Sequence, residues 1–199
     1  MHILIACEFS GIVRDAFLAK GHDAWSCDLL PCEDNPQKHI EGDVLTILSE
    51  SWDLLIAHPP CTYLSYAAVR VWNQPGRAQL REQALEFFMA LYNAPIPRIA
   101  VENPVGWPNT VFRKPDQIIH PYYFGDPHLK RTCLWLKGLP RLAPLSHPIK
   151  PKPLGYYRKG AQKGKACYFT DTVPSPQRAH NRSRSFPSIA KAMADQWGS

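Results

Sequence analysis

A cysteine and a glutamate, each placed where an apolar run ends, are the residues of this chain best suited to covalent chemistry. Cys61 follows two prolines that end the run over residues 54–58, because proline has no N–H to donate to a sheet ladder. Glu102 ends a second apolar run, over residues 99–102, and an Asn-Pro pair follows it. Ligands of open α/β sheets bind at the carboxyl ends of the strands, so this thiol and carboxylate form a candidate pair for covalent catalysis.

The hydrophobic pattern predicts the elements that must hold these two residues. Strands are expected over residues 2–6, 24–28, 54–58, 99–102, 118–124 and 132–136, and Gly42-Asp43-Val44 is expected at the end of a further brief strand. Helices are expected over residues 12–20, 77–93 and 187–197. This alternation of strands and helices predicts an α/β fold with a mainly parallel central sheet.

Length and composition fit one α/β domain of ordinary size. The chain has 199 residues, of which 45% are hydrophobic, and this is enough to form a core. No apolar run approaches the roughly 20 residues that a membrane-spanning helix requires, and the first residues predict a strand rather than a signal peptide. We therefore expect a cytoplasmic protein with no membrane partner.

The six cysteines indicate neither disulfides nor a metal centre. They include no Cys-x-x-Cys pair, and several lie inside apolar runs, where cysteine acts as a small hydrophobic residue. Structural zinc sites usually combine closely spaced cysteines. We expect no metal site.

Charge divides the chain into three parts. Residues 1–140, the expected catalytic core, carry 12 Lys and Arg against 15 Asp and Glu. Residues 141–185 carry 10 Lys and Arg against one acid, Asp171, and are rich in proline and glycine. We expect a small basic recognition segment there, and a C-terminal helix within residues 186–199 that packs back on the core.

The basic segment is interleaved with aromatic residues, a pattern that suits a phosphate-bearing partner such as nucleic acid. Its candidate nucleic-acid-binding residues are Arg158, Lys159, Lys163, Lys165, Arg182 and Arg184. The alternative is a solvated tail that binds nothing.

Acidic residues at two further strand ends indicate nucleotide binding. Asp28 ends the second predicted strand and Asp43 ends the third. In nucleotide-binding α/β folds an acid after the second strand hydrogen-bonds the ribose hydroxyls. Ser10 and Gly11 supply a tight turn after the first strand, although they do not form a complete GxGxxG motif.

Taken in chain order, these motifs resemble those of the cytosine-C5 DNA methyltransferase family, which uses S-adenosylmethionine. The matching segments are Phe9-Ser10-Gly11-Ile12, Gly42-Asp43-Val44, Pro59-Pro60-Cys61-Thr62-Tyr63-Leu64-Ser65, Glu102-Asn103-Pro104, Phe124-Gly125-Asp126-Pro127-His128-Leu129-Lys130 and Ser185-Phe186-Pro187-Ser188-Ile189-Ala190. The Pro-Pro-Cys and Glu-Asn segments, with their spacing, are the specific ones, and the others are weak singly.

The resemblance implies a Rossmann-like methyltransferase fold with a seven-stranded sheet. It implies that the thiolate of Cys61 adds to carbon 6 of a cytosine flipped out of DNA, that Glu102 stabilises the ring, and that Lys130 or Arg131 contacts the 2-oxygen. It places cofactor contacts at Phe9, Ser10, Gly11, Asp28, Asp43 and Pro59, and a nucleic-acid contact at Ser65.

The chain departs from the family pattern at several positions. Val13 stands at a glycine position of the first motif, Cys7 stands where an acid is usual, and Lys130 and Thr132 stand at two arginine positions. Only the short basic segment stands where the family has a large recognition domain. Two alternatives stay open: a methyltransferase for free cytidine nucleotides or single strands, and a non-catalytic nucleic-acid-binding module on a degenerate methyltransferase fold.

Overall fold

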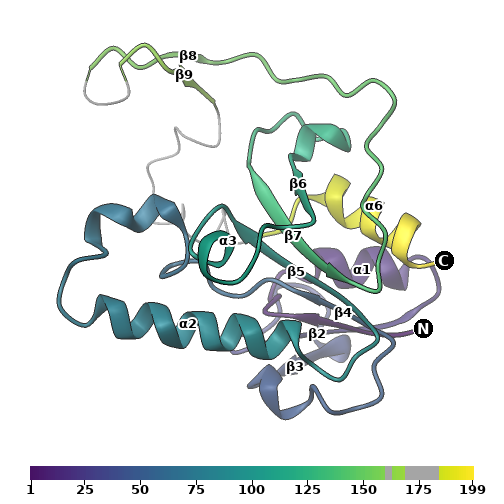
Figure 1. The fold of residues 1–199 in the computed structure, drawn as a ribbon. Coiled ribbons are helices and arrows are strands. Elements are labelled where there is room, and N and C mark those ends of the chain that lie inside the picture. Colours follow the sequence, from purple (N-terminus) through teal and green to yellow (C-terminus); the bar gives the residue numbers. More distant parts are fainter. Residues whose placement is uncertain (160–162, 169–183) are drawn as a thin grey trace.

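The computed structural model describes residues 1–159, 163–168 and 184–199, and its centre is a seven-stranded sheet with helices on both faces (Figure 1). In spatial order the strands are β3 (His39–Glu41), β2 (Asp23–Asp28), β1 (His2–Ala6), β4 (Leu54–Ala57), β5 (Arg98–Pro104), β7 (Thr132–Lys137) and β6 (Gln117–Ile119). The helices are α1 (Ile12–Leu18), α2 (Arg77–Tyr92), the short α3 (Pro108–Val111) and α6 (Pro187–Trp197). Short 3-10 helices span Pro36–Lys38, Val44–Thr46, Tyr66–Val71 and Pro121–Tyr123.

All neighbouring strands from β3 to β5 pair in parallel, and only β7 runs against its two neighbours. The predicted α/β class and mainly parallel sheet are therefore confirmed. The antiparallel β7 was not predicted, because strand direction is set by how the chain crosses the sheet and not by the apolar pattern of the strand.

The order of the strands fixes where a ligand can bind. From β1 the chain adds β2 and β3 on one side, and it then returns to add β4 and β5 on the other. The crevice between the carboxyl ends of β1 and β4 is thus the point where the strand order reverses. Open α/β sheets bind their ligands at such points, because the two outgoing connections separate there.

Alternating side chains along each central strand supply a core on both faces of the sheet. Ile3 and Ile5 of β1 lie in a cluster with residues of α1 and α6, whereas Leu4 and Ala6 lie in a second cluster with residues of α2. All four of these side chains are fully buried. The sheet is therefore covered on both faces. A ligand can reach it at the carboxyl ends of the strands, which the helices do not cover.

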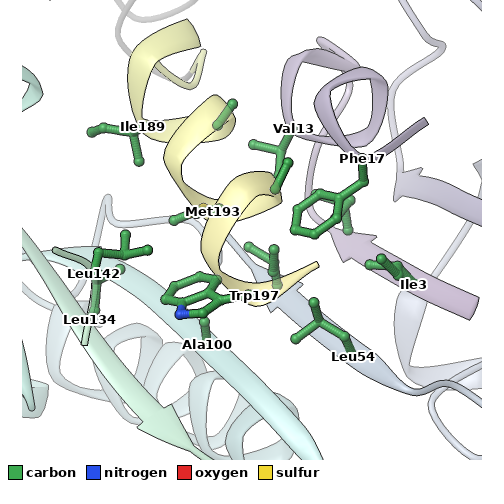
Figure 2. Close-up of a cluster of buried hydrophobic side chains, with 14 of the residues drawn as sticks. Ile3, Val13, Phe17, Leu54, Ala100, Leu134, Leu142, Ile189, Met193 and Trp197 are labelled. Carbon is green, nitrogen blue, oxygen red and sulfur yellow. The ribbon is translucent and has the colours of Figure 1, made fainter. Parts of the chain in front are cut away.

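The C-terminal helix covers the face that α1 also covers. The helix predicted over residues 187–197 has those bounds in the structure. Figure 2 shows Met193 and Trp197 of α6 beside Phe17 of α1 and above Leu134 of β7, within one apolar cluster. The Trp197 indole N–H donates to the carbonyl of Pro140 at 2.9 Å, which ties the end of the chain to the segment after β7.

Three sequence predictions of local structure are corrected. The strand predicted over residues 118–124 ends at Ile119, and a 3-10 helix follows because Pro121 has no N–H for the ladder. The third strand, β3, ends at Glu41, so Gly42-Asp43-Val44 follows the strand instead of ending it. The basic segment is not wholly irregular, since β8 (Gly155–Tyr156) and β9 (Ala166–Cys167) form a small hairpin.

Shortening one core side chain of α6 tests the packing of this helix. Met193 is 1% exposed, so Met193→Ala should lower the free energy of unfolding by about 2–5 kcal/mol. Lys191→Ala, on the exposed side of the same helix, is the matched control and should change it by less than about 0.5 kcal/mol. Urea unfolding of both variants measures the difference, and equal losses would show that α6 is not packed as described.

Candidate active site

The parallel pairing of β4 and β5 ends with Ala57 opposite Val101, so the next residues, His58 and Glu102, lie side by side. They belong to a pocket at this edge of the sheet, whose wall also includes residues from α1, from the segment before β7 and from the start of α6. The lining residues are Val13, His58, Glu102, Lys130, Thr132, Arg184, Ser185, Phe186, Ile189 and Met193. Two of the predicted catalytic residues, Glu102 and Lys130, are therefore brought together.

Cys61, the predicted nucleophile, is exposed on the loop that follows His58, and it is not among the described residues that line this pocket. Its carbonyl accepts the N–H groups of Leu64 at 3.1 Å and Ser65 at 2.9 Å, which folds the loop into a tight turn. Asn103, 1% exposed, donates its side-chain N–H to the carbonyl of Pro59 at 2.8 Å. The residue after the predicted catalytic glutamate thus fixes the loop that carries the predicted nucleophile.

The role of Asn103 was not predicted from the sequence, although the Glu-Asn-Pro motif had singled the residue out. Gly106 adds a second restraint to the same loop, since a Cβ there would lie 2.0 Å from the carbonyl oxygen of Leu64. The chain at Gly106 also forms a β-bridge with Ser65. The Cys61 loop is therefore held against the segment after β5 by a side-chain hydrogen bond and by close backbone packing.

Glu102 is held by a histidine that the sequence analysis did not assign to the site. Nδ1 of His58 lies 3.1 Å from Oε2 of Glu102, and the two side chains are 11% and 18% exposed. Burial raises the pKa of Glu102, but the hydrogen bond from His58 and the charge of Lys130 outweigh it and leave this pKa below the ordinary glutamate value. Glu102 is consequently an ionised acceptor at neutral pH, despite its burial.

The two predicted cations differ in their surroundings. Lys130 lines the pocket, and its Nζ lies 5.6 Å from the centre of the Phe186 ring at the start of α6. Arg131 is exposed and lies outside this lining. Lys130 is therefore better placed than Arg131 to contact a molecule in the pocket.

Glu8 is a buried acid near the end of β1 that the sequence analysis did not single out. It follows β1, is 3% exposed, and its carboxylate accepts the backbone N–H groups of Val13 at 2.7 Å and Arg14 at 3.1 Å. Burial raises its pKa above the ordinary value, although the nearby charge of His58 and these two N–H groups oppose the rise. The sequence does contain an acid after the first strand, but the family pattern has its acid at the position of Cys7, one residue earlier.

The predicted cofactor-binding acids lie around the end of β1. Asp28 follows Cys27, which pairs with Ala6 of β1, and the N–H of Gly42, the residue before Asp43, donates to the carbonyl of Asp28 at 2.9 Å. Burial raises the pKa of the Cys7 thiol, and the charges of Asp28 and Asp43 raise it further. Asp28 accepts the N–H of Leu30 at 3.0 Å, and Asp43 caps the 3-10 helix Val44–Thr46. Three large apolar side chains beside these acids are solvent-exposed: Leu29 (73%), Leu30 (53%) and Leu45 (43%).

The β1–α1 turn holds the other predicted cofactor residues. Phe9 and Ser10 are buried, and Gly11 begins α1 with a φ of 69°, a conformation that favours glycine. A Cβ at Gly11 would also lie 2.3 Å from Nη2 of Arg14. Any contact of Phe9 or Ser10 with a bound cofactor therefore runs through their backbone more readily than through their side chains.

Arg14 is fully buried and links α1 to the β2–β3 connection, which begins at Asp28. Its guanidinium donates to the Ser26 hydroxyl at 3.0 Å, to the Cys32 sulfur at 3.2 Å and to the carbonyl of Asn35 at 3.0 Å. These contacts fix the connection that carries the exposed leucines. The turn of Gly11 and the connection after β2 are thereby joined through Arg14.

The predicted nucleic-acid-binding residues lie in three settings. Arg158, Lys159, Lys163 and Lys165 are exposed on the β8–β9 hairpin, which projects from the body of the chain (Figure 1). Arg184 lines the pocket and its guanidinium lies 3.2 Å from the carboxylate of Glu33. Ser65 is 8% exposed and its hydroxyl accepts the N–H of Ala67, and Arg182 lies outside the described residues.

Comparisons with known proteins add no assignment. No model of a known protein family matches the chain, and a search of curated proteins finds no match. Within residues 1–159, 163–168 and 184–199, no group of three or more His, Cys, Asp or Glu side chains is placed to hold a metal ion. The helices of the same ranges include none with the length and apolar character needed to cross a bilayer.

The two glutamates of the site should affect stability with opposite pH dependence. The raised pKa of Glu8 means that the folded chain binds more protons there, so ionising Glu8 costs stability as pH rises above about 4.3. Glu8→Gln should therefore gain stability relative to the parent chain over that range. The lowered pKa of Glu102 means that its ionisation favours the folded chain. The stability of Glu102→Gln relative to the parent chain should therefore fall as pH rises toward about 4.3.

Urea unfolding of the parent chain and both variants over a pH series measures these slopes. Slopes of the same sign for the two variants would contradict the assigned environments.

Proposed function

We propose that the chain is a cytosine-C5 methyltransferase that transfers a methyl group from S-adenosylmethionine to carbon 5 of cytosine in DNA, through a covalent bond to Cys61. The observation that carries this proposal is the register of β4 and β5, which joins the loop of Cys61 to Asn103, the residue after the ionised Glu102. A nucleophilic thiol next to a buried acceptor in a pocket is the arrangement that covalent base chemistry requires.

The start of α1, the helix after β1, favours a nucleoside-containing cofactor that carries no phosphate. Dinucleotide-binding folds place a pyrophosphate at the N-terminus of the helix after β1. Here the carboxylate of Glu8 already occupies the N–H groups at the start of α1, so an anion is disfavoured there. Sulfonium and amino groups are cationic, and S-adenosylmethionine carries both and no phosphate.

The residues at the ends of β2 and β3 fit the adenosine part of that cofactor. Asp28 and Asp43 offer carboxylates to ribose or ring N–H donors, and the exposed Leu29, Leu30 and Leu45 offer an apolar surface to a flat ring. Covering these leucines with a bound ring would remove apolar area from water and so favour binding. The bound cofactor would supply an electrophilic methyl group.

In the proposed reaction the Cys61 thiolate forms a bond to carbon 6 of cytosine, and this makes carbon 5 nucleophilic. Glu102 accepts a hydrogen bond from the exocyclic amine and orients the ring, and Lys130 contacts the 2-oxygen and stabilises the negative charge that develops as the thiolate adds. After methylation a base takes the proton from carbon 5, the bond between Cys61 and carbon 6 breaks, and the thiolate is regenerated.

The β8–β9 hairpin favours a polynucleotide over a free nucleotide as the substrate. Its exposed cations Arg158, Lys159, Lys163 and Lys165 lie on the same hairpin as Tyr156, which is 65% exposed. Lys and Arg beside an exposed aromatic ring match the needs of phosphate contact and base stacking. A free cytidine nucleotide would need only the pocket, so this surface would have no role.

A mechanism-based trap tests the nucleophile. An oligonucleotide with 5-fluorocytosine has no proton to release from carbon 5, so in the presence of S-adenosylmethionine it should remain covalently attached to Cys61. Mass spectrometry of the digested complex locates the bond. Cys61→Ala should form no adduct and no methylated product, whereas Cys167→Ala, a half-buried cysteine of β9, should behave as the parent chain.

Three substrates distinguish the open alternatives in this trap: duplex, single strand and the free nucleotide. An adduct with the free nucleotide alone would contradict DNA as the substrate. Full activity of Cys61→Ala would contradict covalent catalysis by this residue.

Binding of S-adenosylmethionine tests the cofactor assignment. Asp28→Asn removes a charged acceptor and should weaken binding by about tenfold to a hundredfold, as expected for the loss of a charge-assisted hydrogen bond of about 1.5–3 kcal/mol. Asp34→Asn is the matched control in the same connection and should bind as the parent chain does. Calorimetry measures both, and no binding by the parent chain would favour a non-catalytic nucleic-acid-binding module.

A further inference from the structure

His58 uses one ring nitrogen and leaves the other without a partner. Nδ1 lies 3.1 Å from Oε2 of Glu102, and the side chain is 11% exposed. Nε2 is shielded from solvent and has no hydrogen-bond partner among the residues that the structure describes. Leaving a buried polar atom without a partner is costly, and because His58 lines the pocket, a molecule bound there can supply the partner.

The contact with Glu102 determines what Nε2 can do. An ionised carboxylate only accepts hydrogen bonds, so Nδ1 must carry a proton. In the neutral ring Nε2 then has a free lone pair and accepts a hydrogen bond. His58 and Glu102 together therefore present two acceptors to a molecule in the pocket.

Charged groups face His58 from several elements. Glu8 approaches from the β1–α1 turn and its ionisation responds to the charge of His58, and Glu102 approaches from β5. Lys130 and Arg184 line the same pocket from the segments before β7 and α6. The guanidinium of Arg184 also lies 3.2 Å from the carboxylate of Glu33.

We propose that His58 selects the base by accepting a hydrogen bond through Nε2 from an exocyclic amino group, while its Nδ1 positions Glu102. This inference rests on the proposed function and names a specificity-determining residue for it. The amino group of cytosine has two N–H donors, of which Glu102 accepts one and His58 the other. Uracil and thymine carry a carbonyl oxygen in that place, and an oxygen facing two acceptors would be repelled.

Burial strengthens this discrimination. Nε2 is shielded from water, so a base that fails to donate leaves the atom unpaired in a medium of low dielectric constant.

The first test needs neither cofactor nor substrate. Nitrogen-15 spectra of the imidazole rings in the whole chain report which nitrogen of His58 carries a proton, and His58→Asn assigns the signals. We expect a protonated Nδ1 and an unprotonated Nε2 at neutral pH, with the Nδ1 signal displaced in Glu102→Gln. A proton on Nε2, or no response to Glu102→Gln, would overturn the proposal.

The second test measures base discrimination with single-stranded oligonucleotides that differ only in one cytosine or one uracil. Asn places an amide N–H close to the position of Nδ1, so His58→Asn can still hold Glu102 but lacks Nε2, whereas His58→Ala lacks both. The ratio of cytosine to uracil affinity should fall about tenfold or more in both variants. Turnover, where present, should fall further in His58→Ala than in His58→Asn.

The control is His22→Asn. His22 precedes β2, at the end of the sheet opposite to the pocket, so this variant should keep the parent ratio of cytosine to uracil affinity and the parent turnover. An unchanged ratio in both His58 variants would overturn the role of His58. If the parent chain discriminates the bases and His58→Asn does not, yet no methyl group is transferred, the proposed reaction fails while the selectivity of His58 stands.

Discussion

The parallel register of β4 on β5 is the constraint on which the rest of the site depends. Because Ala57 lies opposite Val101, the following pairs are His58 beside Glu102 and Pro59 beside Asn103. Both pairs are joined by hydrogen bonds, at 3.1 Å and 2.8 Å. A shift of one residue would separate both pairs and turn the strand's buried side chains to the wrong face.

The two apolar clusters hold that register in place. Each residue of β4 is fully buried, alternately against the α1–α6 face and the α2 face, so the strand cannot slide without exposing apolar area. The site thus sits on rigid strands, while the exposed groups that would meet a polymer lie on the Cys61 loop and the β8–β9 hairpin. Rigid positioning and exposed contact surfaces come from different parts of the chain.

Apolar runs in the sequence were sufficient to predict the α/β class, the central strands and the helix Pro187–Trp197, because burial on a sheet or helix face leaves a period in the sequence. The direction of β7 and the end of β6 at Ile119 were beyond that pattern, since they depend on how distant segments cross and on one proline. Cys61 follows a strand as predicted, whereas Glu102, predicted to end its strand, lies within β5, which continues to Pro104.

The partners of those residues could not be read from the sequence. In the sequence His58 is simply the residue before two prolines. Its contact with Glu102, 44 positions away, follows only from the register of β4 on β5. Glu8 was hidden by a one-residue ambiguity after β1, and the burial of Arg14 beneath Gly11 is invisible in a local pattern. Long-range pairing therefore supplied what spacing along the chain could not.

The most direct test of the central claim is the chemical identity of the product. The whole chain is incubated with S-adenosylmethionine and DNA, and the DNA is then digested to nucleosides and separated by mass spectrometry. The account predicts 5-methyl-2′-deoxycytidine that is absent when Cys61→Ala replaces the parent chain. A methyl group on the exocyclic nitrogen of cytosine or on adenine, or 5-methylation that survives in Cys61→Ala, would contradict it.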